Sequence, residues 1–237
     1  MVSTLDLRAA MSESGTSIYE DLKKSILTFQ LMPGENVSEN NLAAKYGTSR
    51  ATIRPILKRL ESETLIHVIP QKGSFVTYLD YDYIKSIMFI RLQVEYEALR
   101  RLTEQLPATV QERFTRTLER EKNITCVDAE GYYSLETEFH RIIFDTLPVT
   151  GVGERIEQLD ESCKRYRLLR YQCLQKTPQI LYEEHLKLYQ KICSCDPDAV
   201  FHCFREYIYG DIDAMEDILE ENWDNYFLKR RKPTEYV

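Results

Sequence analysis

The chain has 237 residues, of which 43% are hydrophobic and 29% are charged, and its formal net charge is −7. This composition is typical of a folded globular protein with one large or two modest domains, and it excludes an intrinsically disordered chain. No apolar run approaches the roughly 18 residues of a membrane span, and the N-terminus lacks a signal-like apolar core. We therefore expect a cytoplasmic protein with no membrane partner.

The charge is unevenly distributed along the chain. Residues 1–80 contain nine basic and nine acidic side chains, so the whole excess of negative charge lies in the remainder. The segment from Lys45 to Lys72 contains six basic residues and only two acidic ones, Glu61 and Glu63. A basic segment on an acidic body is typical of a module that binds phosphates.

The first part of the chain predicts three short helices. Ser17 and Glu20 form a capping box ahead of residues at helical spacing, and this first helix ends before Pro33. Ser38 is placed to cap a second helix, which Gly47 ends.

The third helix is capped by Thr48 or Ser49 and directs apolar residues inward at helical spacing. The β-rich runs "LIHVI" and "SFVTYL" follow it and are separated by "PQKG", which predicts a two-stranded hairpin. The order of one helix, a helix-turn-helix and a two-stranded wing predicts a winged helix-turn-helix domain over residues 1–79.

The remainder, residues 80–237, is predicted to be an all-α bundle, which makes the protein mainly α. No convincing period-2 strand occurs from Tyr83 to Lys229, and amphipathic helical patterns dominate. About six or seven helices are expected, with breaks near Pro107, Asp128, Pro148–Gly153, Pro178, Asp196–Pro197 and Gly210.

The third helix carries residues suited to DNA contact at its N-terminal end. Arg50 and Arg54 lie one turn apart on one face, and an arginine fork can bind guanine O6 and N7. Ser49 and Thr52 can donate to phosphates. At the tip of the wing, three residues could approach the DNA backbone or minor groove: Gln71, Lys72 and Gly73. The alternative is an ordinary solvated basic helix face.

The stretch "PGENVSENNLAAKYGTSRATIRPILKRLESETLIHVIPQKGSFV" (33–76) resembles the N-terminal domain of GntR-family bacterial transcription regulators. The resemblance implies contact with double-stranded DNA from the matched positions Ser49, Arg50, Thr52 and Arg54. It further implies support from Asn40 and from Lys72-Gly73. At position 55 the family pattern has Glu and this chain has Pro. Proline removes one helical hydrogen bond and crowds the preceding turn, so we expect a kink or a first turn that is not α-helical.

The helical part resembles the FadR-like branch of the same family, whose effector-binding (FCD-type) domain is all-helical. By this resemblance, Arg91 matches an arginine that faces a ligand carboxylate. Metal-binding members use one Asp and three His, and those positions here are Glu136, His140, His185 and Tyr207. Because Glu136 and His140 are four residues apart, they share a helical face. A phenol is a poor ligand for a divalent ion at neutral pH.

Three interpretations of this set remain open. Glu136, His140 and His185 could hold one zinc-like divalent ion. Alternatively, Arg91, His140, His185 and Tyr207 could form a metal-free polar pocket for a small carboxylate effector. The histidines could also be purely structural.

The sequence as a whole predicts a ligand-responsive transcriptional regulator and no enzyme. Repression is the commoner output in the resembling family. We expect a homodimer that reads a pseudo-palindromic operator. The alternatives are a winged-helix interaction protein without DNA binding and a helical metalloenzyme.

Overall fold

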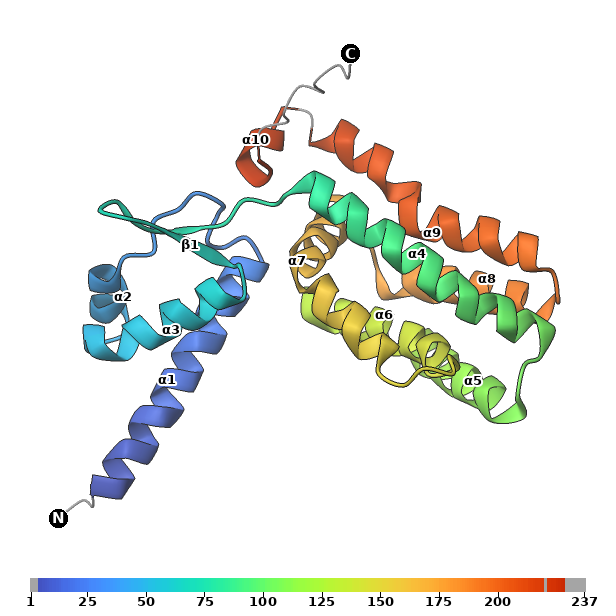
Figure 1. Cartoon of the computed structure of the whole chain (residues 1–237), viewed down its shortest axis with the longest axis horizontal. Coiled ribbons are helices and arrows are strands. Elements are labelled where there is room, and N and C mark those ends of the chain that lie inside the picture. Colours follow the sequence, from blue (N-terminus) through green and yellow to red (C-terminus); the bar gives the residue numbers. More distant parts are fainter. Residues whose placement is uncertain (1–3, 220, 229–237) are drawn as a thin grey trace. The chain divides into compact units, whose positions relative to one another are not determined.

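The computed structural model describes residues 4–219 and 221–228, and the chain forms two compact units. The first unit comprises the chain up to Asp80 together with the segment from Asp224 onward, and the second runs from Tyr81 to Trp223. Figure 1 shows helices and one hairpin in the first unit, and helices throughout the described part of the second. None of the described helices is both long enough and apolar enough to cross a membrane.

Three helices form the body of the first unit: α1 (Thr4–Leu27), α2 (Glu39–Lys45) and α3 (Arg50–Ser62). Both α1 and α2 pack against α3. Leu22 and Ile26 of α1 and Ile53 and Leu60 of α3 are fully or almost fully buried. These residues recur at helical spacing, so each helix presents one apolar stripe to the shared core.

The first helix begins earlier than the sequence predicted. Ser17 and Glu20 lie inside α1, and so they do not cap its start. The preceding residues include Ala9, Ala10 and Met11, which are good helix formers. The capping-box prediction is therefore wrong, because the same residue pattern also fits a helix interior.

The wing consists of β1 (Ile66–Ile69) and β2 (Gly73–Val76), which pair antiparallel. The register joins Ile66 to Val76 and Ile69 to Gly73, so three residues form the turn. Ile66 and Val76 are buried against the helices. The predicted hairpin and its position directly after α3 are confirmed, and the winged helix-turn-helix is complete.

The C-terminal segment returns to the first unit, whereas the sequence division had placed all residues after 80 in the helical domain. The Leu79 N–H donates to the Tyr226 carbonyl at 2.9 Å, and the Leu228 N–H donates to the Leu79 carbonyl at 2.9 Å. Tyr226 packs edge-on against Phe29 at 5.3 Å between ring centroids. The winged unit therefore ends in a segment about 150 residues away in sequence, which no local pattern could have placed there.

Six long helices form the second unit: α4 (Tyr81–Glu104), α5 (Ala108–Lys122), α6 (Ala129–Phe144), α7 (Val152–Cys173), α8 (Pro178–Cys193) and α9 (Pro197–Ile218). A short α10 (Trp223–Tyr226) follows. Helix α4 packs against α6, α7, α8 and α9, so it is central to the bundle. The remaining close pairs include α5 with α8, α6 with α7, and α8 with α9.

Most helix starts coincide with residues that can cap them. The side chain of Asp128 accepts from the Gly131 N–H, Thr177 caps α8, and Asp196 caps α9. The predicted break at Gly210 is wrong, because α9 continues through it to Ile218. A glycine costs a helix only about 1 kcal/mol, and the buried face of α9 continues beyond it to Met215.

Candidate functional site

The N-terminus of α3 has the geometry of a recognition helix. Ser49 has extended backbone angles, and its hydroxyl accepts from the Thr52 N–H at 3.2 Å. The N–H groups of Thr52 and Ile53 both donate to the Ser49 carbonyl, at 3.1 and 3.2 Å. Because the cap satisfies these donors, the helix begins sharply at Arg50. The hydroxyls of Ser49 and Thr52 also lie 3.1 Å apart, so they form one polar pair.

Pro55 lies within this helix and does not interrupt it. The assigned α-helix runs from Arg50 through Pro55 to Ser62. The expectation of a non-helical first turn is therefore wrong. Proline forfeits one backbone bond, and the buried side chains of Ile53, Ile56 and Leu57 on both sides hold the helix to the core.

The two arginines predicted to touch DNA have different surroundings. Arg50 is exposed at the first position of α3. Arg54 is also exposed, but its Nε and Nη2 donate to the two Glu39 carboxylate oxygens at 3.0 and 3.1 Å. The Arg54 hydrogen bonds hold the pKa of Glu39 below its ordinary value. Arg54 is therefore ion-paired with Glu39 of α2, whereas no hydrogen bond or ion pair found within residues 4–219 and 221–228 joins Arg50 to an acidic side chain.

The other predicted DNA contacts lie in α2 and the wing. Asn40 is exposed on α2, and Gln71 and Lys72 are exposed in the wing turn. Gly73 has φ +121°, and a Cβ there would lie 2.8 Å from the Asn36 amide nitrogen, so this position requires glycine. In Figure 1 the wing turn and the N-terminal end of α3 lie at the same end of the unit.

In the helical unit, His140 of α6 belongs to a buried ion-pair chain. Its Nδ1 is hydrogen-bonded to Glu95 of α4, and Glu95 accepts from the Arg91 Nε at 3.0 Å. All three residues are at most 4% exposed. Burial favours the neutral form of Glu95, but His140 and Arg91 more than offset it and hold the pKa of that carboxyl below its ordinary value. Burial lowers the pKa of His140.

His185 of α8 has a similar anchor. Its Nδ1 lies 3.0 Å from both carboxylate oxygens of Glu121 of α5. Its ring stacks on Phe139 at 3.9 Å between centroids with an 8° tilt. The sequence reasoning missed both glutamates, Glu95 and Glu121. The sequence feature that could have identified them is a carboxylate on the apolar face of an amphipathic helix, where a buried charged group needs a partner.

Tyr207 of α9 lies against both histidines, and we call His140, His185 and Tyr207 the histidine cluster. Its ring centroid lies 5.1 Å from that of His140 and 6.1 Å from that of His185. The phenol donates to Glu136 of α6 at 2.9 Å, and Arg167 of α7 lies 3.8 Å from the other Glu136 oxygen. Burial, reinforced by Glu136, raises the pKa of Tyr207 well above its ordinary value, so the phenol keeps its proton.

The predicted metal set does not fit this geometry. Among the described residues, no three His, Cys, Asp or Glu side chains are grouped so that they could hold a metal ion. Glu136, His140 and His185 are among the described residues, and they do not form such a group. Both Glu136 oxygens already have partners, in Tyr207 and Arg167.

The structure brings His140, His185 and Tyr207 together through ring contacts. Each of the three is hydrogen-bonded to a different glutamate, namely Glu95, Glu121 and Glu136 respectively.

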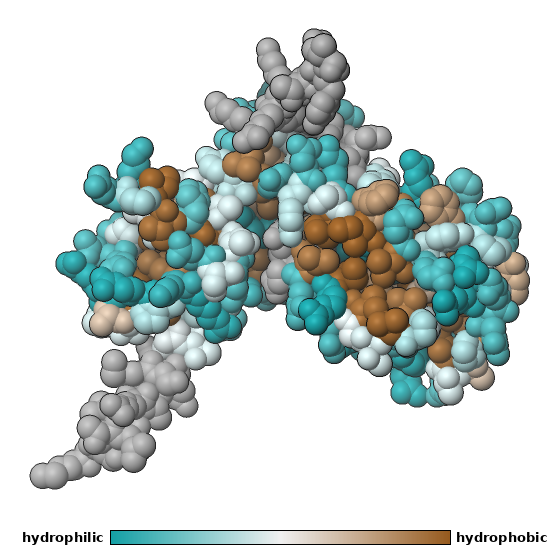
Figure 2. Space-filling view, in the orientation of Figure 1, coloured by the Kyte–Doolittle hydropathy of each residue, from teal (hydrophilic) through white to brown (hydrophobic). Residues whose placement is uncertain are grey.

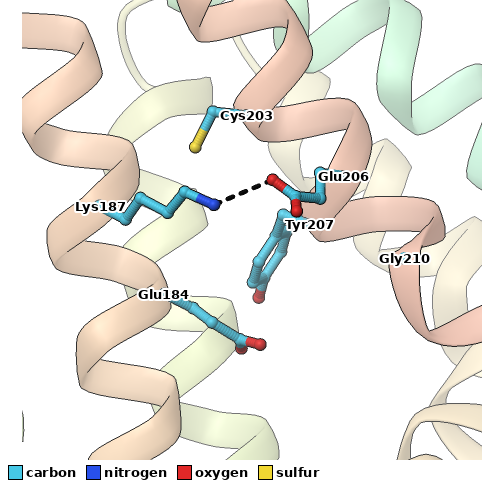
Figure 3. Close-up of a pocket in the computed structure, with 6 residues that line it drawn as sticks. All are labelled: Glu184, Lys187, Cys203, Glu206, Tyr207 and Gly210. Carbon is cyan, nitrogen blue, oxygen red and sulfur yellow. Dashed lines mark hydrogen bonds and ion pairs between the residues drawn. The ribbon is translucent and has the colours of Figure 1, made fainter.

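Two cavities adjoin the cluster, and Tyr207 lines both. The inner cavity has a volume of only about 10 Å³ and is lined by Arg91, Arg167 and Arg170, among others. The outer pocket, between α8 and α9, has a volume of about 220 Å³. Figure 3 shows the Tyr207 ring extending into this pocket beside the Lys187–Glu206 ion pair. The sequence reasoning missed Arg167 and Arg170, whose signal was the recurrence of arginine in the apolar run "RYRLLRY".

A winged helix-turn-helix followed by a helical unit with a polar, arginine-rich interior defines a DNA-binding transcriptional regulator. The chain belongs to the gntR family of bacterial regulatory proteins, whose model matches residues 15–76, and it carries an FCD domain, matched over residues 86–210. The first match contains every residue predicted to touch DNA. The second contains the histidine cluster.

Relatives of known name agree with this classification. The HTH-type transcriptional repressor RspR of Escherichia coli K12 is 23% identical over 208 residues, which cover 87% of this chain and 91% of RspR. An HTH-type transcriptional regulator of Streptomyces ambofaciens is 27% identical over 201 residues, or 85% and 84% of the two chains. These names are those of transcription regulators and not of enzymes.

Solved structures share the fold. E. coli McbR/YncC superposes with a TM-score of 0.56 at 22% identity, covering 86% of this chain and 97% of the other. A putative GntR regulator from Rhodococcus sp. RHA1 superposes with the same TM-score at 18% identity, covering 87% and 97%.

Proposed function

We propose that this protein is a cytoplasmic, homodimeric repressor. Its affinity for operator DNA is lowered when a small carboxylate binds in the helical unit. The observation that carries the proposal is the inner cavity lined by Arg91, Arg167 and Arg170. Guanidinium groups are suited to carboxylates because their planar N–H forks can bind both oxygens at once. Arginine from two helices, α4 and α7, is therefore aimed at one small volume.

The small size of the cavity suggests how ligand binding would change the positions of the surrounding helices. A volume of about 10 Å³ has room for about one water. A carboxylate of several atoms must therefore displace α4, α7 or α9 as it enters. The outer pocket of about 220 Å³ on the other side of Tyr207 provides an approach. A coupling of about 1–3 kcal/mol between the two states would change operator affinity by roughly fivefold to a hundredfold.

The surface of α4 supports assembly with a second copy. Tyr83, Phe89 and Ile90 are 42%, 59% and 39% exposed, although they are large apolar side chains. Figure 2 shows apolar surface gathered over α4 on this face of the helical unit. A homodimer through such a surface would present two wings to the two half-sites of a pseudo-palindrome. Phe89→Glu should then lower the molar mass measured by light scattering to that of one chain.

Repression is the proposed output because the E. coli relative of this chain is named as a repressor. In that case, bound protein blocks transcription, and the carboxylate restores it. The winged unit supports the DNA half of the proposal through the exposed Arg50 at the start of α3 and Lys72 in the wing turn.

The test begins with an operator selected from random duplex DNA by the full-length protein. Anisotropy titrations with a panel of small carboxylates then identify those that release it. Arg170→Ala should raise the releasing concentration by about tenfold or more, because a charge-assisted hydrogen bond is lost. It should leave operator affinity without ligand unchanged.

Arg116→Ala is the matched control, because Arg116 is exposed on α5 and pairs only with Glu112 among the described ion pairs. It should respond like the wild type. Failure to select any sequence would reject DNA recognition, and an unchanged release curve for Arg170→Ala would reject the arginine-lined cavity.

A further inference from the structure

The exposed face of α3 carries an apolar stripe. Ile53, Leu57 and Leu60 are buried, so they define the face that α3 presents to the core of the winged unit. With about 3.6 residues per turn, positions 51 and 55 fall on the opposite face, one turn apart. Ala51 and Pro55 are exposed there. The centre of the outer face is therefore formed by two side chains that carry no charge.

Basic side chains border this stripe. Arg50 precedes it at the first position of α3, and the exposed Lys58 lies about one turn beyond Pro55. Arg54 is hydrogen-bonded to Glu39 of α2 through two guanidinium nitrogens. Basic groups bind phosphates and the acceptor atoms of guanine, and the stripe between them has to meet a different kind of group.

Neither side chain of the stripe can form a hydrogen bond with a base. Alanine offers only a methyl group, and proline offers only its ring, without a backbone N–H. A polar base edge set against them would lose its hydrogen bonds to water, which is costly. The apolar group that an unmodified base presents in the major groove is the C5-methyl of thymine. The stripe formed by Ala51 and Pro55 is therefore complementary to thymine.

Pro55 is not explained by the stability of α3. Proline destabilises a helix interior, and because its ring is exposed, burial in the core offsets little of that cost. The family pattern has Glu at this position, which would add a negative charge to the face of α3 that carries Arg54 and Lys58. Proline removes that charge and extends the apolar surface of Ala51 by one turn.

In a helix-turn-helix, the N-terminal part of the recognition helix meets the base edges of the major groove. We propose that Ala51 and Pro55 are specificity-determining residues that contact the C5-methyl of one thymine in each half-site of the operator. This inference rests on the proposed recognition of an operator, and it names a chemical group that the operator must present. The same contact accepts the methyl group of 5-methylcytosine, which projects into the major groove from the same ring position.

The first experiment removes single methyl groups from the selected operator. Deoxyuridine, which pairs as thymidine does but lacks the C5-methyl, replaces each thymine in turn, and anisotropy measures the affinity of the full-length protein. At one thymine position the affinity should fall by about fourfold for each substituted half-site, which is the effect of burying one methyl group. A wild-type protein that binds every deoxyuridine operator as tightly as the thymine operator overturns the proposal. So does a selected operator that contains no thymine.

Two variants at position 55 separate the apolar contact from the backbone effect of proline. Pro55→Ala and Pro55→Gln both restore a helical N–H, but only alanine keeps the side chain apolar. The loss caused by deoxyuridine should persist in part for Pro55→Ala and disappear for Pro55→Gln. Pro107→Gln is the matched control, since Pro107 is an exposed proline directly before α5 of the helical unit, and it should show the full loss. Equal losses for Pro55→Gln and the wild type overturn the proposal.

A second measurement separates the methyl group from the shape of the duplex. Cytosine and then 5-methylcytosine, each paired with guanine, replace the sensitive thymine. The wild type should bind the 5-methylcytosine operator about fourfold more tightly than the cytosine operator, and Pro55→Gln should bind the two equally. Equal binding by the wild type overturns the methyl contact and leaves the proposed repressor standing, whereas failure to select any operator overturns both.

Discussion

In the winged unit the arginines expected to meet DNA lie on the surface, whereas in the helical unit arginine, glutamate and histidine side chains are enclosed. Arg54 and Glu39 pair where water reaches both, but Arg91 and Glu95 pair with at most 5% of either side chain exposed. Solvent screens the first pair and leaves it easily exchanged for a phosphate. The second pair cannot be exchanged without a large cost in stability. A DNA-binding surface needs replaceable partners, and a ligand site needs groups held in place.

The largest expected effect is on the stability of the buried chain. Glu95→Ala leaves the Arg91 charge buried without its carboxylate, and it should lower the free energy of unfolding by about 3–5 kcal/mol. Urea unfolding followed by circular dichroism measures the change. Glu97→Ala is the control on the same helix, because its pairs with Arg100 and Arg101 are largely exposed. It should cost less than about 1 kcal/mol, and equal losses would show that burial makes no difference.

A smaller effect is expected at the DNA surface. Arg50→Ala removes the exposed arginine that starts α3, so discrimination between operator and random DNA should fall by about tenfold to a hundredfold. Competition anisotropy at fixed salt measures it. Arg116→Ala makes the same change in net charge on the helical unit and should leave discrimination intact. A variant that still distinguishes operator from random DNA would show that the reading side chain lies elsewhere.

The smallest expected effect concerns the solvent-exposed ion pair between Arg54 and Glu39. Glu39→Gln removes the carboxylate that holds Arg54, so binding to random duplex DNA should tighten by no more than about fivefold. The slope of log affinity against log salt should steepen by about one, because one further cation reaches a phosphate. Glu61→Gln is the control, because it makes the same change in net charge at the other end of α3. An unchanged slope for Glu39→Gln would mean that Arg54 stays away from the DNA backbone.

Much of the fold could be predicted from local pattern. The caps at Ser38 and Ser49, the hairpin after α3 and the breaks at Pro107 and Asp128 are all seen in the structure. Each depends on a few neighbouring residues whose backbone preferences are strong. The errors arose where local preference was weak: at Gly210, within α9, and at the Ser17 capping box, within α1.

The candidate site was predicted in part. His140, His185, Glu136 and Tyr207 do lie together, but their partners were missed. Glu121 reaches His185 from 64 positions away, and Glu95 reaches His140 from 45. Such pairings depend on how helices are packed and not on spacing within one helix.

The sequence alone determined which segments are helical, where the wing lies and which arginines begin the recognition helix, because propensity, capping and periodicity act over a few residues. Only the tertiary structure decided how charge is used. It paired Arg54 with Glu39, set the Tyr207 phenol on Glu136 and brought Arg167 and Arg170 to the cavity beside Arg91. Those outcomes depend on the distances and burial that the packing of helices creates, since both the strength of an ion pair and its cost change with access to water.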